Sequence, residues 1–176
     1  MARASLIDFE SFSVGPIAGD SVIVNVDGVD VMFSGPGLQI RDVSFLGAGA
    51  DRTLSTTDDA GPITVEFLGG FTADSIDIQN WLPLGPGEVD YINGVAYNSS
   101  NVVLDTETNA NSDFHLAGSG ITKMVFQEGN PTEGFLLDNF SFNGKGTVPD
   151  SGLTAGMLGA VFAGLVYVRR KFVVRS

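Results

Sequence analysis

The sequence predicts an all-β protein, an antiparallel β-sandwich of jelly-roll type, followed by a single C-terminal transmembrane helix. Three observations support this prediction. About ten short β-branched and aromatic runs are separated by turn residues at intervals of about ten residues. Glycine is abundant, with 23 residues, while charged residues make up only 17% of the chain. One long uncharged run lies near the C-terminus.

The first expected strand is residues 6–12, in which Leu6, Asp8 and Glu10 alternate with Ile7 and Phe9. Such alternation is typical of a half-buried strand. Residues 21–35 hold two β-rich runs around an Asp-Gly pair, which predicts a hairpin. A strand is expected at 37–45, followed by a polar, glycine-rich loop over 46–62.

Seven further strands are expected. A short glycine turn separates two of them, 112–118 and 121–127, which predicts a second hairpin. The Phe side chains and Trp81 are expected to fill the core between two sheets. The alternative for Trp81 is an exposed platform for sugar stacking beside the Pro/Gly loop 83–90. The seven strands are 63–69, 73–81, 91–98, 101–106, 112–118, 121–127 and 134–142.

The chain divides into three parts: a β-sandwich domain over residues 1–143, a linker over 144–152 and a transmembrane segment with a basic tip over 153–176. Leu153 to Val168 are 16 residues without charge. As a helix they rise about 24 Å, which suffices for a thin span with snorkelling basic residues after it. These residues, Arg169, Arg170 and Lys171, favour a cytoplasmic C-terminus and an extracytoplasmic sandwich. The alternative is a buried helix, which its all-round apolar surface disfavours.

The tail resembles a family of sorting signals. Val148, Pro149, Asp150, Ser151 and Gly152, then the apolar run, then the basic cluster resemble the PEP-CTERM class, in its VPDSG variant. The resemblance implies a bacterial envelope protein that is the substrate of a membrane-embedded exosortase. The enzyme would cut near the Pro-Asp motif, and Arg169, Arg170 and Lys171 would stop transfer. The body would then be released or held at the cell surface, often in bacteria that make exopolysaccharide or biofilm.

Export also needs an N-terminal signal, and the first twelve residues enter strand-like sequence without a basic region and apolar stretch. We therefore expect that the natural start lies upstream of Met1, or that this chain is truncated just before Ser5.

Charge and cysteine content exclude several classes of function. Residues 1–147 carry 20 acidic and 5 basic residues, a net charge of −15, whereas residues 148–176 carry one acidic and four basic residues, a net charge of +3. The body is therefore expected to repel nucleic acid and anionic lipid. The absence of cysteine excludes disulfides and thiolate metal sites.

No residue set predicts catalysis, and we expect a non-enzymatic protein. The only histidine, His115, lies in a strand without a nucleophile motif and is expected to be a structural or surface residue. Among the many carboxylates, Asp8, Glu10 and Asp138 are the predicted ligands of a structural Ca²⁺. This arrangement resembles jelly-roll carbohydrate-binding modules, whose first and last strands are neighbours. The alternative is that these three are solvent-facing or turn-capping residues.

A second candidate for calcium or partner binding is the loop acid set Asp51, Asp58 and Asp59, for which the favoured alternative is an ordinary mobile loop. The expected function is that of a cell-surface or secreted protein, whose body serves adhesion, matrix or glycan binding with extracellular polysaccharide as partner. Two alternatives stay open: a carbohydrate-active hydrolase on the same scaffold, and a soluble β domain with a buried C-terminal helix.

Overall fold

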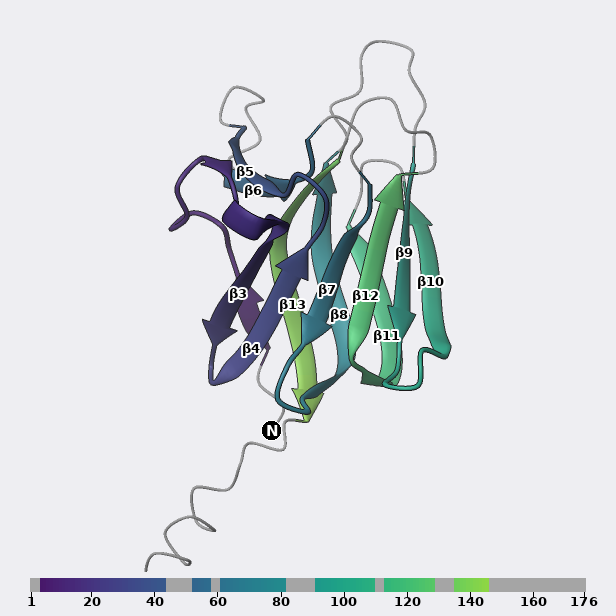
Figure 1. Ribbon diagram of the computed structural model, residues 1–176. Coiled ribbons are helices and arrows are strands. Elements are labelled where there is room, and N and C mark those ends of the chain that lie inside the picture. Colours follow the sequence, from purple (N-terminus) through teal and green to yellow (C-terminus); the bar gives the residue numbers. More distant parts are fainter. Residues whose placement is uncertain are drawn as a thin grey trace, which may run out of the picture. The chain divides into compact units, whose positions relative to one another are not determined.

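Two antiparallel β-sheets face each other in the computed structural model of the protein (Figure 1), which confirms the all-β prediction. The structure describes residues 4–43, 52–57, 61–81, 91–109, 113–128 and 135–145. These residues belong to one unit, Met1–Gly146. They contain thirteen strands and one 3₁₀ turn, η1 (Ala18–Asp20).

Sheet A has the strand order β11-β8-β13-β6-β5-β2, and β1 also pairs with β13. Its strands are β1 (Ser5–Ile7), β2 (Gly15–Pro16), β5 (Gln39–Asp42), β6 (Arg52–Ser55), β8 (Thr72–Trp81), β11 (Phe114–Ile121) and β13 (Leu136–Lys145). Sheet B has the order β10-β9-β12-β7-β4-β3. Its strands are β3 (Ser21–Val26), β4 (Val29–Ser34), β7 (Ile63–Phe67), β9 (Ile92–Tyr97), β10 (Val103–Asn109) and β12 (Lys123–Glu128).

The hairpin predicted at Asp27-Gly28 is confirmed. The two residues have φ values of 52° and 82°, the left-handed conformations that a two-residue turn of type I′ requires. Strands β3 and β4 pair over their full length on either side of this turn. The expected alternation at the N-terminus is also found, since Ile7 and Phe9 are buried between exposed neighbours, although β1 already ends at Ile7.

One strand lies where a loop was predicted. Strand β6 falls inside the expected loop 46–62 and pairs with both β5 and β13. Its residues Thr53, Leu54 and Ser55 are almost completely buried. A strand with a single aliphatic side chain lacks the β-branched or aromatic run on which the prediction depended, so tertiary burial overrode the local polar pattern.

The second predicted hairpin is wrong. Strand β11 pairs with β8 in sheet A, and β12 pairs with β7 and β9 in sheet B, so the chain crosses between sheets at this turn. Thr122 fixes the crossing: its N–H donates to the carbonyl of Tyr97, and its carbonyl accepts the N–H of Phe67. The turn glycine Gly120 has a φ of 85°. A glycine turn alone does not specify whether the next strand returns to the same sheet.

The prediction that phenylalanines form the core is confirmed. Phe140 is central, with ring centroids 5.5 Å from Phe33, 6.2 Å from Phe67 and 5.9 Å from Phe142. The Phe33 and Phe140 rings meet edge-on, an arrangement that aromatic quadrupoles favour. Among the described residues, nine phenylalanines are buried: Phe9, Phe33, Phe67, Phe71, Phe114, Phe126, Phe135, Phe140 and Phe142. Trp81 ends β8 opposite Leu136, but its side chain lies outside the described part of the chain.

The last strand runs to Lys145, two residues past the predicted domain boundary. Gly144 fits there because it has no side chain: a Cβ at this position would lie 2.4 Å from the carbonyl oxygen of Thr72 and 2.6 Å from the ring of Phe71. Strand β13 thus leads directly to the segment that carries the sorting motif. No helix within the described residues is long and apolar enough to cross a membrane, and the predicted span Leu153–Val168 lies outside them.

Candidate functional site

An open cleft of about 330 Å³ lies at one end of sheet B. Its lining comes from the end of β7, the β9–β10 turn and the crossing between β11 and β12. The residues are Glu66, Phe67, Leu68, Asn98, Ser99, Asn101, Thr122 and Lys123. We call it the Lys123 cleft. Most of these side chains are polar, so the cleft can exchange hydrogen bonds with a ligand.

The ammonium group of Lys123 has a fixed position. It lies 4.8 Å from the centroid of the Tyr97 ring and donates a hydrogen bond of 2.5 Å to Oδ1 of Asn101. An ammonium above an aromatic face is attracted by the ring quadrupole. Asn101 itself adopts the left-handed backbone conformation, with φ of 57°.

The β9–β10 turn that forms one wall of the cleft is organised by Asn98. Its Oδ1 accepts the backbone N–H groups of Ser100 at 2.9 Å and Val102 at 3.0 Å. Its backbone N–H donates to the carbonyl of Val102, and its carbonyl accepts from Asn101. This wall is therefore built before any ligand arrives.

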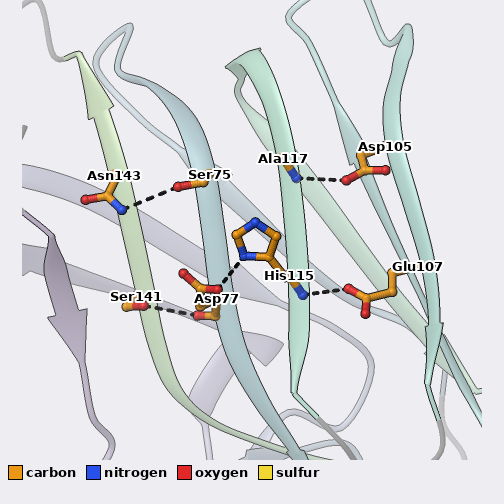
Figure 2. A network of polar contacts seen from close by, with 8 residues as sticks. All are labelled: Ser75, Asp77, Asp105, Glu107, His115, Ala117, Ser141 and Asn143. Atoms are coloured by element: carbon orange, nitrogen blue, oxygen red, sulfur yellow. Dashed lines mark hydrogen bonds and ion pairs between the residues drawn. The ribbon is translucent and has the colours of Figure 1, made fainter.

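A second polar area covers the outer face of sheet A (Figure 2). Ser141, Asp77 and His115 lie opposite one another on β13, β8 and β11. In the next row, Nδ2 of Asn143 donates to Oγ of Ser75 at 3.4 Å. The side chains bond to partners across the strands, so this face is a hydrogen-bonded surface.

His115 is an exposed residue, as predicted, with 64% of its side chain accessible. Its Nδ1 lies 2.6 Å from Oδ1 of Asp77. This hydrogen bond and the charge of Asp77 raise the pKa of the His115 imidazole above 6.5, against a small opposing effect of desolvation. Glu107 and Asp105 add to the increase.

The two sheets are joined along one seam by carboxylates of β10 (Figure 2). Glu107 accepts the backbone N–H of His115 at 2.5 Å, and Asp105 accepts that of Ala117 at 2.8 Å. These amides belong to β11, the edge strand of sheet A, and the carboxylates belong to the edge strand of sheet B. The side chains thus supply the acceptors that a neighbouring strand would provide.

The predicted calcium ligands lie within electrostatic range of one another. Asp138 is 2% exposed, and burial raises its pKa, as do the charges of Glu10 and Asp8, while the Asn139 backbone N–H lowers it. Oδ1 of Asp138 accepts that N–H at 2.7 Å, and Glu10 accepts the backbone N–H of Arg52.

These three carboxylates do not form a ready-made metal site. Over the described ranges, no group of three or more His, Cys, Asp or Glu residues is arranged to hold a metal ion. Calcium binding by Asp8, Glu10 and Asp138 therefore stays a prediction. The other predicted site residues, Asp51, Asp58, Asp59, the motif Val148–Gly152 and the basic cluster Arg169–Lys171, lie outside the described residues.

Sequence reasoning missed the Lys123 cleft. Its polar lining is drawn from three separate segments, and the crossing at Thr122 that brings them together was predicted to be a hairpin. The only local signal is the "NSSN" stretch at 98–101, which indicates a turn and nothing about a ligand.

The fold is similar to that of solved β-sandwich structures. A DUF4465 family protein from Bacteroides caccae aligns with a TM-score of 0.51 at 8% identity, over 81% of this chain and 100% of that chain. A carbohydrate-binding module described as recognising mannan, TmCBM27, aligns at a TM-score of 0.45 and 12% identity, over 82% of this chain and 100% of that one. No curated protein matches the chain significantly in sequence.

The C-terminal segment gives a direct match. The VPDSG-CTERM motif model covers residues 147–172, which include the Val-Pro-Asp-Ser-Gly stretch, the apolar run and the basic cluster. The match begins two residues after strand β13 ends. The chain therefore carries a PEP-CTERM-like C-terminal sorting signal.

Proposed function

We propose that this protein is a non-enzymatic bacterial cell-surface or secreted protein whose β-sandwich binds glycans of the extracellular matrix. The observation that carries the proposal is the sorting signal, which directly follows the last strand of the sandwich. In this proposal the sorting signal directs the sandwich to the cell surface, and residues 153–168 serve as a transient membrane span. An exosortase that cuts near Pro149 and Asp150 would release the body from this span.

The Lys123 cleft supports a binding role for the body. It offers an ammonium, a carboxylate, amide groups and hydroxyls in one open depression of about 330 Å³. Polyhydroxylated ligands need donors and acceptors side by side, because each hydroxyl can both donate and accept. The wall formed by the β9–β10 turn is held by hydrogen bonds of Asn98, so this wall needs little ordering on binding.

The surroundings of His115 give no support to a hydrolase of the Ser-His type. Its Nδ1 is paired with Asp77, but none of the described Ser or Thr hydroxyls is hydrogen-bonded to the imidazole. Catalysis by a Ser or Thr nucleophile requires such a hydroxyl within reach of the base. A glycosidase would use two carboxylates instead, and the following experiment tests that alternative.

The experiment that separates binding from hydrolysis uses the purified full chain and a panel of insoluble polysaccharides. We expect the chain to sediment with at least one polysaccharide and to release no reducing sugar from it. Release of reducing ends that scales with protein concentration would instead support the hydrolase alternative. A chain that sediments with none of the panel would contradict glycan binding.

Calcium is tested separately with the same full chain. A Ca²⁺ ion held by Asp8, Glu10 and Asp138 would raise the thermal unfolding midpoint, since a ligand that binds only the folded state stabilises it. The increase would be lost in Asp138→Asn. An unchanged midpoint at millimolar Ca²⁺ would contradict the calcium prediction.

A further inference from the structure

We propose that the Lys123 cleft binds a single neutral sugar residue through neighbouring hydroxyls, with Glu66 as acceptor and Lys123 and Asn98 as donors. This inference rests on the proposed glycan-binding function and names its site and ligand class. It begins from the size of the cleft. A volume of about 330 Å³ lies at the lower end of the range for small-ligand sites, about 300–1,000 Å³, which fits one sugar ring better than a long chain segment.

The lining offers unused hydrogen-bonding capacity. An ammonium has three N–H donors, and Lys123 uses one on Asn101. The side-chain oxygen of Asn98 is occupied by two backbone N–H groups, which leaves its amide N–H groups as donors toward the cleft. Ser99 and Thr122 add hydroxyls.

Glu66 and Lys123 are direct cross-strand partners on β7 and β12. Nevertheless, no carboxylate in the described part of the chain forms an ion pair with Lys123, whose ammonium is drawn toward Tyr97 and Asn101 instead. A carboxylate acceptor and an ammonium donor therefore line the same cleft without forming an ion pair with each other. Two adjacent sugar hydroxyls can bridge such a pair, one donating to Glu66 and the other accepting from Lys123.

Charge favours a neutral sugar over an acidic one. Residues 1–147 carry a net charge of −15, and Glu66 lies in the cleft beside Lys123. A uronate carboxylate would gain one ammonium contact but would meet Glu66 at short range and the acidic body at long range. A neutral sugar uses both groups without this repulsion.

The test is a titration of the ¹⁵N-labelled full chain, kept in a zwitterionic detergent whose headgroup is not a sugar. The probes are the methyl glycosides of glucose, galactose and mannose, with glucuronate as the acidic comparison. We expect at least one neutral glycoside to shift the amide signals of Asn98, Ser99, Asn101 and Thr122, and glucuronate to bind more weakly.

Two variants and a matched control locate the site. We expect Glu66→Gln and Lys123→Met each to weaken binding by about ten- to a hundredfold, the usual loss for hydrogen bonds to charged groups. Asp20→Asn is the control. It removes the same charge as Glu66→Gln at an exposed residue outside the cleft, and its φ of 54° suits Asn equally well. Well-dispersed amide spectra show that each variant is folded.

The outcomes distinguish this inference from the function on which it rests. A neutral glycoside that binds equally well to wild type and Glu66→Gln would overturn the cleft assignment and leave glycan binding intact. If glucuronate bound more tightly than the neutral glycosides, and only Lys123→Met weakened its binding, the assignment of a neutral sugar as ligand would be overturned. Failure of all these sugars to bind, in a chain that also sediments with no polysaccharide, would contradict both proposals.

Discussion

The carboxylate of Glu107 accepts the backbone N–H of His115 across the seam between the two sheets, at 2.5 Å. Asp105, two residues earlier on the same strand, does the same for Ala117. Residues two apart on a strand share a face, so one side of β10 is aligned with alternate amides of β11. The edge of sheet A is thus protected by acidic side chains, which also discourage pairing with another chain.

Removing both acceptors should loosen this seam. In Asp105→Ala/Glu107→Ala the two amides lose their partners, and we expect a loss of about 2 kcal/mol in the free energy of unfolding, about 1 kcal/mol per bond. Hydrogen exchange should accelerate most at the amides of His115 and Ala117. Thr106→Ala, an exposed change between them, is the control. Equal exchange rates in the double variant and the control would contradict the role of the carboxylates.

The pairing of His115 with Asp77 should be visible in an NMR titration. Because Asp77 stabilises the imidazolium, the midpoint of His115 should lie above 6.5 and move back toward 6.5 in Asp77→Asn. The associated stabilisation is fully present below pH 6.5 and is lost as the pH rises through the raised midpoint. A midpoint that is the same in wild type and variant would refute the interaction.

The effect of Asp138 on the pH dependence of stability should have the opposite sign to that of an acid in a salt bridge. Burial raises its pKa above 3.8, so the folded state binds its proton more tightly than the unfolded state does. Stability should therefore fall as the pH rises from 3.8 through the folded-state pKa, and Asp138→Asn should reduce this slope. Urea unfolding of the wild type and of Asp138→Asn between pH 3.5 and 7, in the presence of EDTA, measures the free energy of unfolding and its pH slope in each. A slope unchanged by the substitution would assign the pH dependence to other groups.

Phe140 should be among the most sensitive positions of the core. It is fully buried and contacts three other buried rings. We expect Phe140→Ala to reduce the free energy of unfolding by about 3–5 kcal/mol, the usual cost of truncating a buried aromatic residue. Phe12→Ala, at a partly buried ring beside Phe9, should cost clearly less in the same denaturant experiment. Equal losses would argue against Phe140 as the centre of the core.

Local chemistry decided which parts of the fold were predictable. The Asp27-Gly28 turn has its own backbone requirement, so its hairpin could be predicted from two residues. Strand β6 could not, because the burial of Thr53 and Ser55 depends on β13 as well as on the nearby β5, and β13 is distant in sequence. The crossing after Gly120 was missed for the same reason, since pairing partners of β11 and β12 are set by the whole sandwich.

The sites show a similar division. The sorting signal is contiguous, so its motif, apolar run and basic cluster could be identified together from the sequence. The Lys123 cleft depends on Glu66, Asn98 and Lys123, which are brought together only by strand order. The charges of Asp8 and Glu10 act on Asp138, but no group of three such residues in the described ranges is arranged to hold a metal ion, so the calcium site stays a prediction.

The central claim is that the chain is sorted and processed through its C-terminal signal. Mass spectrometry of the C-terminal peptide of the native protein, isolated from cells and from culture medium, tests it most directly. The account predicts a mature C-terminus near Pro149 and Asp150, with residues 153–176 absent from the surface-located or secreted form. A native protein outside the cell that still ends at Ser176 would contradict it.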